Sequence, residues 1–473
     1  MAERKPIFYD EQRRRWRWTR RVLEIAGALF TLIVVVFFLN VIRKVNLPKL
    51  MLVDPHPVLH AIKSKRPAKP VVYRTGRRRR VAALGHVPEN YDPLRAAFYV
   101  PWDANSFNSL QKHYRDIDVL MPEQLQAVSA DGSLGVEPDP KLSSWLKSLG
   151  IELPIMPLVQ NYDGHQWRIA EIIAMLAHPE ARQRLSKAIA NYATAQKDPG
   201  VVVDLEEVPD KSQPDFKKFT RDLATALHAA NLKLMVALPA RDNAYDYAYI
   251  GSQADAIILM NYDQHWTSSP PGPIASQDWF VENIQQVVKL VPPEKLVMGI
   301  ANYTYDWPVP KKRDKHGPPP IAQSTSFQEA IVHAVESEAT VDYDSDSLNP
   351  HYSYEDDDQV HSVWMLDGIT AYNQLRAAER AGVRGTALWR LGDEDPSLWS
   401  IWDAIHPDDS TRARLEDCPP GYDITLEGAG DIWRITDTPK SGKRSFEYDP
   451  ATDTFSDESY DSYHLSWRID QLG

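Results

Sequence analysis

Cysteine is almost absent from this sequence, since Cys418 is the only one in 473 residues. A single cysteine excludes an intramolecular disulfide framework and any cysteine-rich zinc or iron–sulfur site. The 14 histidines show no H-E-x-x-H motif or comparable ligand spacing, so we expect neither a metal nor another cofactor. No glycine-rich phosphate loop follows the first apolar run, which leaves a Rossmann nucleotide site without support.

Basic residues are scarce over most of the chain. Residues 1–80 contain 20 Lys and Arg against 5 Asp and Glu, whereas the other 393 residues contain 33 against 60. A body with this excess of acidic groups is a poor nucleic-acid binder, because neutralising phosphates requires a basic surface. We therefore expect no nucleic-acid partner.

A long apolar run lies within the basic N-terminal region. Residues 22–42 carry one charge, Glu24, and about 20 apolar residues are enough for a helix to span a bilayer. Eight basic residues precede the run, so the positive-inside rule predicts a cytoplasmic N-terminus and an extracytoplasmic body. The predicted order is a cytoplasmic tail 1–21, a single-pass transmembrane signal anchor 22–42 and a linker 43–92. A buried helix of the body is the alternative for 22–42.

The body shows short apolar runs separated by amphipathic stretches. Eight such runs are 96–102, 117–121, 153–159, 200–206, 232–239, 256–262, 295–303 and 385–391, and helices are predicted at 179–196 and 214–230. Buried strands alternating with helices predict an α/β fold with a parallel sheet, and eight is the number that closes a (β/α)₈ TIM barrel. An open doubly wound sheet is the alternative.

The rest of the body divides around this pattern. We expect the barrel at 93–407, with a small α+β insertion in the long connection between the seventh and eighth strands. Residues 408–473 form a C-terminal β appendage or junction in this prediction, because 420–470 alternate polar and apolar residues.

Two carboxylates stand at the end of the fourth run, where 198–209 reads DPGVVVDLEEVP. Side chains alternate along a strand, so residues 202, 204 and 206 share one face and residues 201, 203 and 205 share the other. Active sites of (β/α)₈ barrels lie at the C-terminal strand ends, so we expect Asp204 and Glu206 in one cavity there. Like charge and partial burial raise the pKa of one carboxyl and make it a general acid. An ion-paired strand end is the alternative.

This segment resembles the fourth-strand signature D-G-x-D-x-D-x-E of family 18 glycoside hydrolases. Glu206 falls on the catalytic acid and Asp204 on the assisting aspartate, whereas Pro199 and Val202 replace two aspartates. Further segments resemble the family in order, namely 259–263, 296–303 with Trp307, 363–367 and 385–392. The resemblance covers about residues 95–405 and is greatest to the chitinase-like, bacterial cell-wall-lytic branch.

The resemblance implies substrate-assisted hydrolysis of a polysaccharide or oligosaccharide with N-acetylated amino sugars. Glu206 would protonate the leaving oxygen, Asp204 would orient the acetamido group, and Tyr262 would hydrogen-bond its oxygen. Trp389 would stack under the sugar. The further substrate-binding candidates are Asp263, Trp102, Trp266 and Trp307, and ordinary core packing is the alternative for each tryptophan.

Two other functions stay open at this stage. The absence of an aspartate at Val202 removes a like-charged neighbour, so Asp204 should ionise more easily, and a catalytically weak or inactive glycan-binding barrel is the alternative to a hydrolase. Similar anchored barrels also form the N-terminal part of multimodular proteins that carry polysaccharide deacetylase and glycosyltransferase modules. In that interpretation the chain is a fragment of a larger membrane protein.

Overall fold

The computed structural model describes residues 21, 31, 66–67, 91–309, 321–344, 346–356 and 359–402, together with five strands between 424 and 471. The predicted span 22–42 lies outside the described residues except for Thr31, as do the tail before Arg21 and most of the linker. Within the described part of the chain, no helix has both the length and the apolar character needed to cross a membrane.

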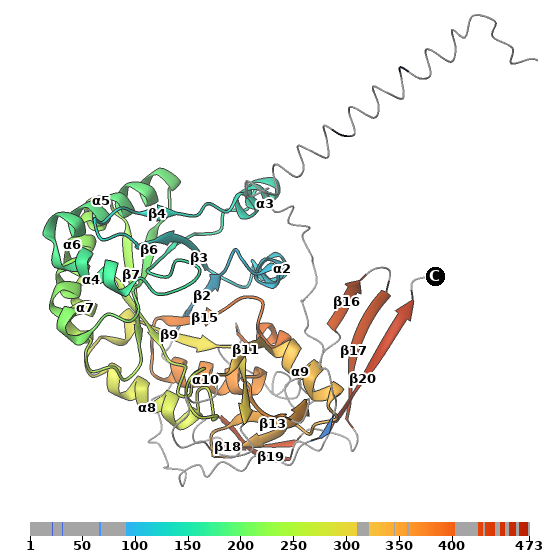
Figure 1. The fold of residues 1–473 in the computed structure, drawn as a ribbon. Helices are drawn as coiled ribbons and strands as arrows, with labels where there is room; N and C mark the ends of the chain where they lie inside the picture. The colour runs from blue at the N-terminus through green and yellow to red at the C-terminus, as the bar shows by residue number, and fades with distance from the viewer. Residues whose placement is uncertain are drawn as a thin grey trace, which may run out of the picture. The chain divides into compact units, whose positions relative to one another are not determined.

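Eight parallel strands form a closed barrel (Figure 1). They are β2 (Leu94–Tyr99), β3 (Val119–Gln126), β5 (Leu158–Gln160), β6 (Gly200–Asp204), β7 (Lys233–Pro239), β8 (Ala256–Met260), β9 (Leu296–Ala301) and β15 (Gly385–Trp389). The order is β2-β15-β9-β8-β7-β6-β5-β3, and pairing between β2 and β3 closes the ring. Each strand overlaps one predicted apolar run, so the predicted barrel is confirmed. The open sheet is wrong, because β2 has a partner on both edges.

The barrel strands separate two apolar layers. Phe98, Met121, Leu158, Val202 and Met235 pack together inside the barrel. The alternate residues of the same strands pack outward against the helices, as side-chain alternation requires.

A helical layer covers the outside of the barrel (Figure 1). Its helices are α2 (Ala104–His113), α3 (Pro140–Leu149), α4 (Ile169–Ala177), α5 (Pro179–Gln196), α6 (Gln213–Ala229), α7 (Tyr247–Gln253), α8 (Gln277–Val287) and α10 (Gly368–Arg380). Short 3₁₀ turns lie at Asp210–Ser212, Pro293–Lys295 and Pro396–Ser400, and β4 (Gly135–Val136) pairs antiparallel with β3. A proline in the first turn of α3, α5 and α6 suits a position whose N–H has no helical partner.

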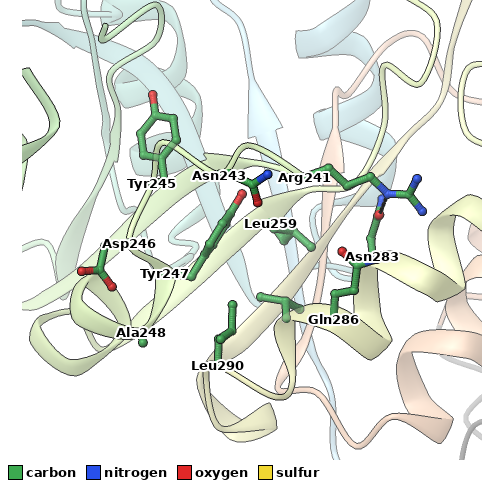
Figure 2. A pocket seen from close by; sticks show the side chains of 11 residues that line it. Arg241, Asn243, Tyr245, Asp246, Tyr247, Ala248, Leu259, Asn283, Gln286 and Leu290 are labelled. Atoms are coloured by element: carbon green, nitrogen blue, oxygen red, sulfur yellow. Dashed lines mark hydrogen bonds between the residues drawn. The ribbon is translucent and has the colours of Figure 1, made fainter. Parts of the chain in front are cut away.

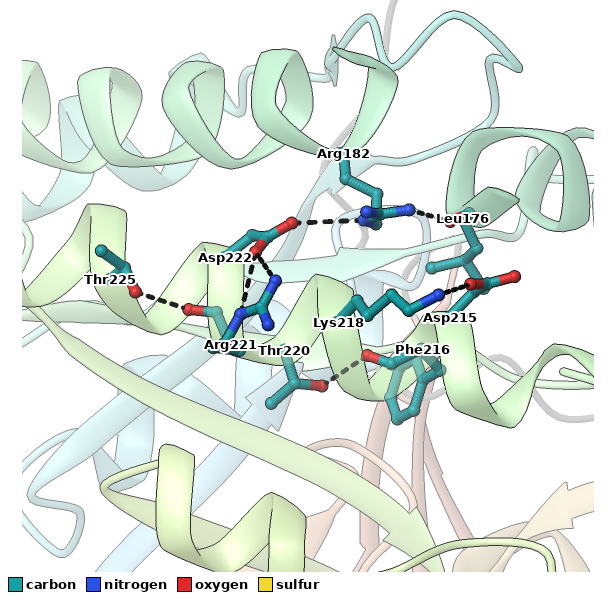
Figure 3. A network of polar contacts seen from close by, with 9 residues as sticks. All are labelled: Leu176, Arg182, Asp215, Phe216, Lys218, Thr220, Arg221, Asp222 and Thr225. Atoms are coloured by element: carbon teal, nitrogen blue, oxygen red, sulfur yellow. Dashed lines mark hydrogen bonds and ion pairs between the residues drawn. The ribbon is translucent and has the colours of Figure 1, made fainter. Parts of the chain in front are cut away.

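Paired charges join three of these helices (Figure 3). The guanidinium of Arg182 on α5 donates to Asp222 on α6 at 3.2 Å and to the backbone oxygen of Leu176 on α4 at 2.6 Å. Arg221 binds the other oxygen of Asp222 at 2.8 Å, while Lys218 and Asp215 form a separate pair at 2.7 Å. Asp222 and Asp215, the acidic side chains of this network, are therefore each paired with a cation.

An α+β lobe is inserted between the seventh and eighth barrel strands. It contains β10 (Tyr303–Val309), β11 (Gln323–Ser326), α9 (Phe327–Glu336), β12 (Asp342–Asp344), β13 (Asn349–Asp356) and β14 (Gln359–Trp364). Its antiparallel sheet has the order β1-β13-β14-β10-β11, where β1 is Arg66–Pro67 and β12 pairs with β13. The lobe has a core of its own, in which Phe327 and Ile331 of α9 pack with Tyr352 and Val363 of the sheet.

Five further strands lie where the C-terminal alternation predicts β structure. They are β16 (Ile424–Gly428), β17 (Asp431–Pro439), β18 (Ser445–Asp449), β19 (Thr454–Ser459) and β20 (Tyr463–Gln471). β17 pairs with β16 on one side and with β20 on the other, and β18 pairs with β19, all antiparallel.

Candidate active site

The fourth barrel strand carries Asp204 at its C-terminal end. Val202 is completely buried inside the barrel, and Asp204, one step further along the same face, is 4% exposed. The strand ends at Asp204 rather than at Glu206 as predicted, so Glu206 begins the following loop. Leu205 still points outward into the apolar layer under the helices. The predicted alternation is therefore confirmed up to Leu205.

A buried asparagine holds Glu206 in place beyond the strand. The backbone N–H of Glu206 donates to Asn161 Oδ1 at 2.8 Å, and Asn161 Nδ2 donates to the backbone oxygen of Glu206 at 3.0 Å. The side chain of Asn161 thus makes the pair of hydrogen bonds that a neighbouring strand would otherwise provide. Sequence reasoning missed Asn161, whose only signal is its position directly after the third strand.

The two carboxylates have unusual acidity. Burial raises the pKa of Asp204 well above its usual range, and the nearby charges of Glu206 and Glu123 raise it further. Burial also raises the pKa of Glu206 to about 7, with additional contributions from Asp263 and Glu207. One oxygen of Asp204, Oδ1, is buried without a hydrogen-bond partner. Asp204 and Glu206 are therefore the kind of groups that hold a proton near neutral pH.

The sixth strand contributes Tyr262 and Asp263. Tyr262 is 9% exposed, and its ring lies 6.2 Å from that of Tyr303. Asp263 is accessible to solvent, adopts a left-handed backbone with φ of 60°, and accepts hydrogen bonds from Tyr303 and, at 2.9 Å, from Tyr305. Desolvation by the surrounding protein raises the pKa of Asp263, whereas the two phenol hydrogen bonds lower it. Sequence reasoning missed this role of the lobe tyrosines.

The predicted tryptophans fall into different surroundings. Trp389 ends β15, is partly buried and packs edge-on against Phe98 with 5.0 Å between ring centroids. Trp102 and Trp266 are 64% and 51% exposed, so both leave ring surface open to a ligand. Trp307 is completely buried in the lobe beside Tyr305, and this corrects its expected place in a binding subsite. Its ring has no face accessible to a sugar.

Trp102 is held by polar groups on both its edge and its face. Its Nε1 donates to Glu123 Oε2 at 2.9 Å, and the guanidinium of Arg390 lies 4.6 Å from its ring centroid. Arg390 in turn pairs with Asp103 at 2.5 Å and with Asp393 at 3.2 Å. These contacts fix an exposed ring that would otherwise lose rotamer freedom on binding.

Among the described residues, no group of three or more His, Cys, Asp or Glu side chains is arranged to hold a metal ion.

A separate hollow of about 200 Å³ opens in the helical layer (Figure 2). Leu259 and Val287 line it, and Arg241 lies at one side, where its guanidinium binds Asn283 and, at 2.6 Å, Glu282. Tyr247 lines it from α7 and donates to the backbone oxygen of Pro239 at 2.6 Å. None of the predicted site residues lines this hollow.

Sequence comparisons show which known proteins this chain is similar to. Residues 164–395 match glycosyl hydrolases family 18. The glycosylase YvbX of Bacillus subtilis is 24% identical over 313 residues, which are 64% of this chain and 88% of that protein. The cortical fragment-lytic enzyme of Bacillus subtilis is 25% identical over 281 residues, which are 57% of this chain and 64% of that enzyme.

Solved structures show the same fold. A chitinase from Chromobacterium violaceum has a TM-score of 0.60 at 24% identity, covering 67% of this chain and 100% of that one. The spore cortex-lytic enzyme SleL of Bacillus megaterium has a TM-score of 0.59 at 22% identity, covering 68% and 75%. Residues 164–395, which include Asp204 and Glu206, are therefore similar to glycosyl hydrolases family 18, and the barrel has the fold of the chitinase and spore cortex-lytic enzyme structures.

Proposed function

We propose that this barrel hydrolyses glycosidic bonds in an N-acetylhexosamine-containing polysaccharide by a substrate-assisted retaining mechanism. The observation that carries the proposal is Glu206, whose pKa of about 7 lets it hold a proton at neutral pH beside a buried Asp204. General acid catalysis is most effective when the pKa lies near the working pH. Chitin-like glycans and peptidoglycan are the substrate candidates, because the relatives include enzymes named chitinase and spore cortex-lytic enzyme.

The first step breaks the bond between the anomeric carbon and the leaving oxygen. Glu206 gives its proton to that oxygen, and the acetamido oxygen of the same sugar bonds to the anomeric carbon and forms an oxazolinium ring. Asp204 orients the acetamido group and, once ionised, stabilises the positive charge of the ring. Tyr262 donates a hydrogen bond to the acetamido oxygen. Two carboxylates then suffice without an enzyme nucleophile, as in the substrate-assisted exceptions among glycosidases.

The second step restores the acetamido group. Glu206, now a carboxylate, takes a proton from water, and the water oxygen bonds to the anomeric carbon as the ring oxygen leaves. The sugar is released with its original anomeric configuration, and Glu206 is protonated for the next cycle. Trp389 supports the central sugar, while Trp102, Trp266 and Asp263 contact neighbouring groups.

The direct test incubates the protein with chito-oligosaccharides and with peptidoglycan fragments in water enriched in oxygen-18. We expect products that carry one heavy oxygen at the new reducing end by mass spectrometry and retain the anomeric configuration by NMR. Glu206→Gln should lower turnover by about 10²–10⁴-fold, whereas Glu180→Gln, at an exposed carboxylate of α5, should leave it unchanged. Equal absence of products from the wild type and Glu206→Gln would reject the hydrolase.

A glycan-binding barrel is the second candidate, and Val202 favours it. This side chain is fully buried among apolar residues at the position of an assisting carboxylate. If the wild type binds chito-oligosaccharides in calorimetry with the same affinity as Glu206→Gln and neither variant cuts them, this candidate replaces the hydrolase.

The cell envelope is the proposed place of action, with 22–42 as membrane anchor and the barrel outside. Deacetylase and glycosyltransferase modules are proposed partners in a larger protein. A reporter fused after residue 60 should be active only on the outer side of the membrane, and recovery of the full chain in the soluble fraction would contradict the anchor.

A further inference from the structure

The second barrel strand places a carboxylate level with Val202. In the parallel register, Glu123 of β3 lies opposite Leu158 of β5, and Leu158 lies opposite Val202 of β6. Val119 and Met121 of β3 point into the barrel, so alternation turns Glu123 to the same inner face at the C-terminal end. The barrel therefore has a carboxylate at this level, on a strand two places away from the one where the family pattern has it.

Glu123 is fixed in that place by two side chains. Trp102 Nε1 donates to it at 2.9 Å, and Gln160 also forms a side-chain hydrogen bond with it. Gln160 is 8% exposed and lies opposite Asp204 in the register between β5 and β6. Glu123 is thus bound by a side chain from the strand next to Asp204.

The groups that face Asp204 are mainly acidic. Glu206 follows it in the chain, Glu123 faces it from β3, and two phenols, Tyr262 after β8 and Tyr245 after β7, complete the set. The cation that acts on Glu123 is Arg390, which is engaged by Asp103 and Asp393. Among the described residues no ion pair involves Asp204, so its ionisation depends on burial first and then on its acidic neighbours.

We propose that Glu123 is a positioning residue that replaces the carboxylate absent at position 202 and, through its charge, raises the pH at which Asp204 ionises. Burial raises the pKa of Glu123 as well, and a charge on either carboxylate opposes ionisation of the other. This explains why Asp204 is hard to ionise in the structure although Val202 predicts the opposite: burial and Glu206 are joined by a like charge from another strand. The catalytic consequence of this coupling rests on the proposed hydrolase function, but the coupling itself does not.

The first experiment reads ionisation without requiring turnover. The full-length protein is labelled with carbon-13 at aspartate carboxyl groups, and the Asp204 signal is identified by its loss in Asp204→Asn. In Glu123→Gln, which keeps shape and hydrogen bonding, Asp204 should titrate at lower pH than in the wild type, because one like charge is gone. Glu137→Gln, at an exposed carboxylate near Glu123, is the matched control and should leave the titration unchanged.

A second pair of variants separates position from charge. Glu123→Gln combined with Val202→Asp should return the Asp204 titration toward higher pH, because the carboxylate now stands two residues away on β6. Trp102→Phe removes an indole donor that lowers the pKa of Glu123, so Glu123 should lose part of its charge and the Asp204 titration should move to lower pH by less than in Glu123→Gln. In kinetics, Glu123→Gln should move the acid limb of kcat to lower pH, whereas loss of the exposed indole in Trp102→Phe should mainly raise KM.

An Asp204 titration that is identical in the wild type and Glu123→Gln would overturn the proposal, whether or not the protein cuts glycans. A titration that shifts as expected in a protein without turnover would keep the coupling and reject the hydrolase. If the double variant fails to fold, the single Glu123→Gln titration still decides.

Discussion

Acidic residues of the outer helical layer are paired with cations. Those of the barrel mouth, the C-terminal strand ends around Asp204 and Glu206, lie beside other carboxylates. Asp222, on α6 of the helical layer, binds Arg182 at 3.2 Å and Arg221 at 2.8 Å (Figure 3). Asp204, at the mouth, has one buried oxygen with no hydrogen-bond partner and carboxylates as neighbours. A paired carboxylate contributes to holding elements together, whereas a buried and unpaired one makes protonation favourable.

The two regions also differ in how their charges affect the stability of the fold. Charges in the helical layer are matched because removing one partner leaves the other buried and destabilises the protein. Charges at the mouth repel, which destabilises the fold slightly and prepares a proton donor near neutral pH. We therefore expect substitutions in the two regions to affect different measurements.

The largest expected effect is on turnover at the mouth. Glu206→Gln should lower kcat by about 10²–10⁴, because the leaving oxygen loses its proton donor. Steady-state rates on chito-oligosaccharides or peptidoglycan fragments measure this, with Glu180→Gln on α5 as control. The free energy of unfolding should not fall, because the substitution removes a carboxyl that resists ionisation. A large loss of stability would show that Glu206 is structural.

The pH dependence of Glu206 follows from its pKa of about 7. As a general acid it must be protonated, so kcat should fall as the pH rises through about 7. The folded pKa is raised, so the contribution of this group to stability is complete below its unfolded pKa and is lost as the pH rises toward 7. Urea unfolding of the wild type and Glu206→Gln at several pH values measures the difference. A difference that grows toward acid pH would contradict this sign.

The next effect in size belongs to the helical layer. Arg182→Met should lower the free energy of unfolding by about 3 kcal/mol, since it leaves Asp222 and the Leu176 carbonyl without the buried guanidinium. Chemical denaturation measures it, and Lys187→Met on the same helix is the control. Turnover per folded molecule should stay the same. Loss of turnover without loss of stability would show that the Arg182–Asp222 network affects the active site rather than the fold.

A smaller effect is expected where the lobe meets the mouth. Tyr305→Phe removes one hydrogen bond to Asp263, so the pKa of Asp263 should rise and its charge should be lost at a given pH. The pKa of Glu206 should then fall, because the charge of Asp263 contributes to raising it. The basic limb of kcat should move to lower pH, and Tyr249→Phe on α7 should not move it. A shift of the basic limb to higher pH would contradict the expectation that the charge of Asp263 raises the pKa of Glu206.

The smallest effect is expected on the surface of the helical layer. Lys218→Ala removes a pair with Asp215 whose lysine side chain is 51% exposed, so the free energy of unfolding should change by less than about 1 kcal/mol. The change should shrink further at high salt. A loss as large as that for Arg182→Met would show that surface pairs in this layer stabilise as much as buried ones.

The sequence alone predicted much of the barrel. Eight apolar runs in alternation with amphipathic stretches each overlap a barrel strand, because strand and helix periodicity are local properties of the chain. Alternation along 201–205 also predicted which side chains face the helices, and it placed Asp204 on the inner face above Val202. Glu206 was found from its motif, but the end of the strand at Asp204 was not.

Only the tertiary structure decided which groups meet at the mouth. Asn161, Glu123 and Tyr305 come from the third strand, the second strand and the inserted lobe, and nothing in their local sequence connects them to Glu206, Asp204 or Asp263. Trp307 was expected in a subsite and is buried, because the lobe sheet folds around it. Periodicity reports how one segment is buried, whereas the acidity of Asp204 depends on charges that closure of the barrel brings together from separate strands.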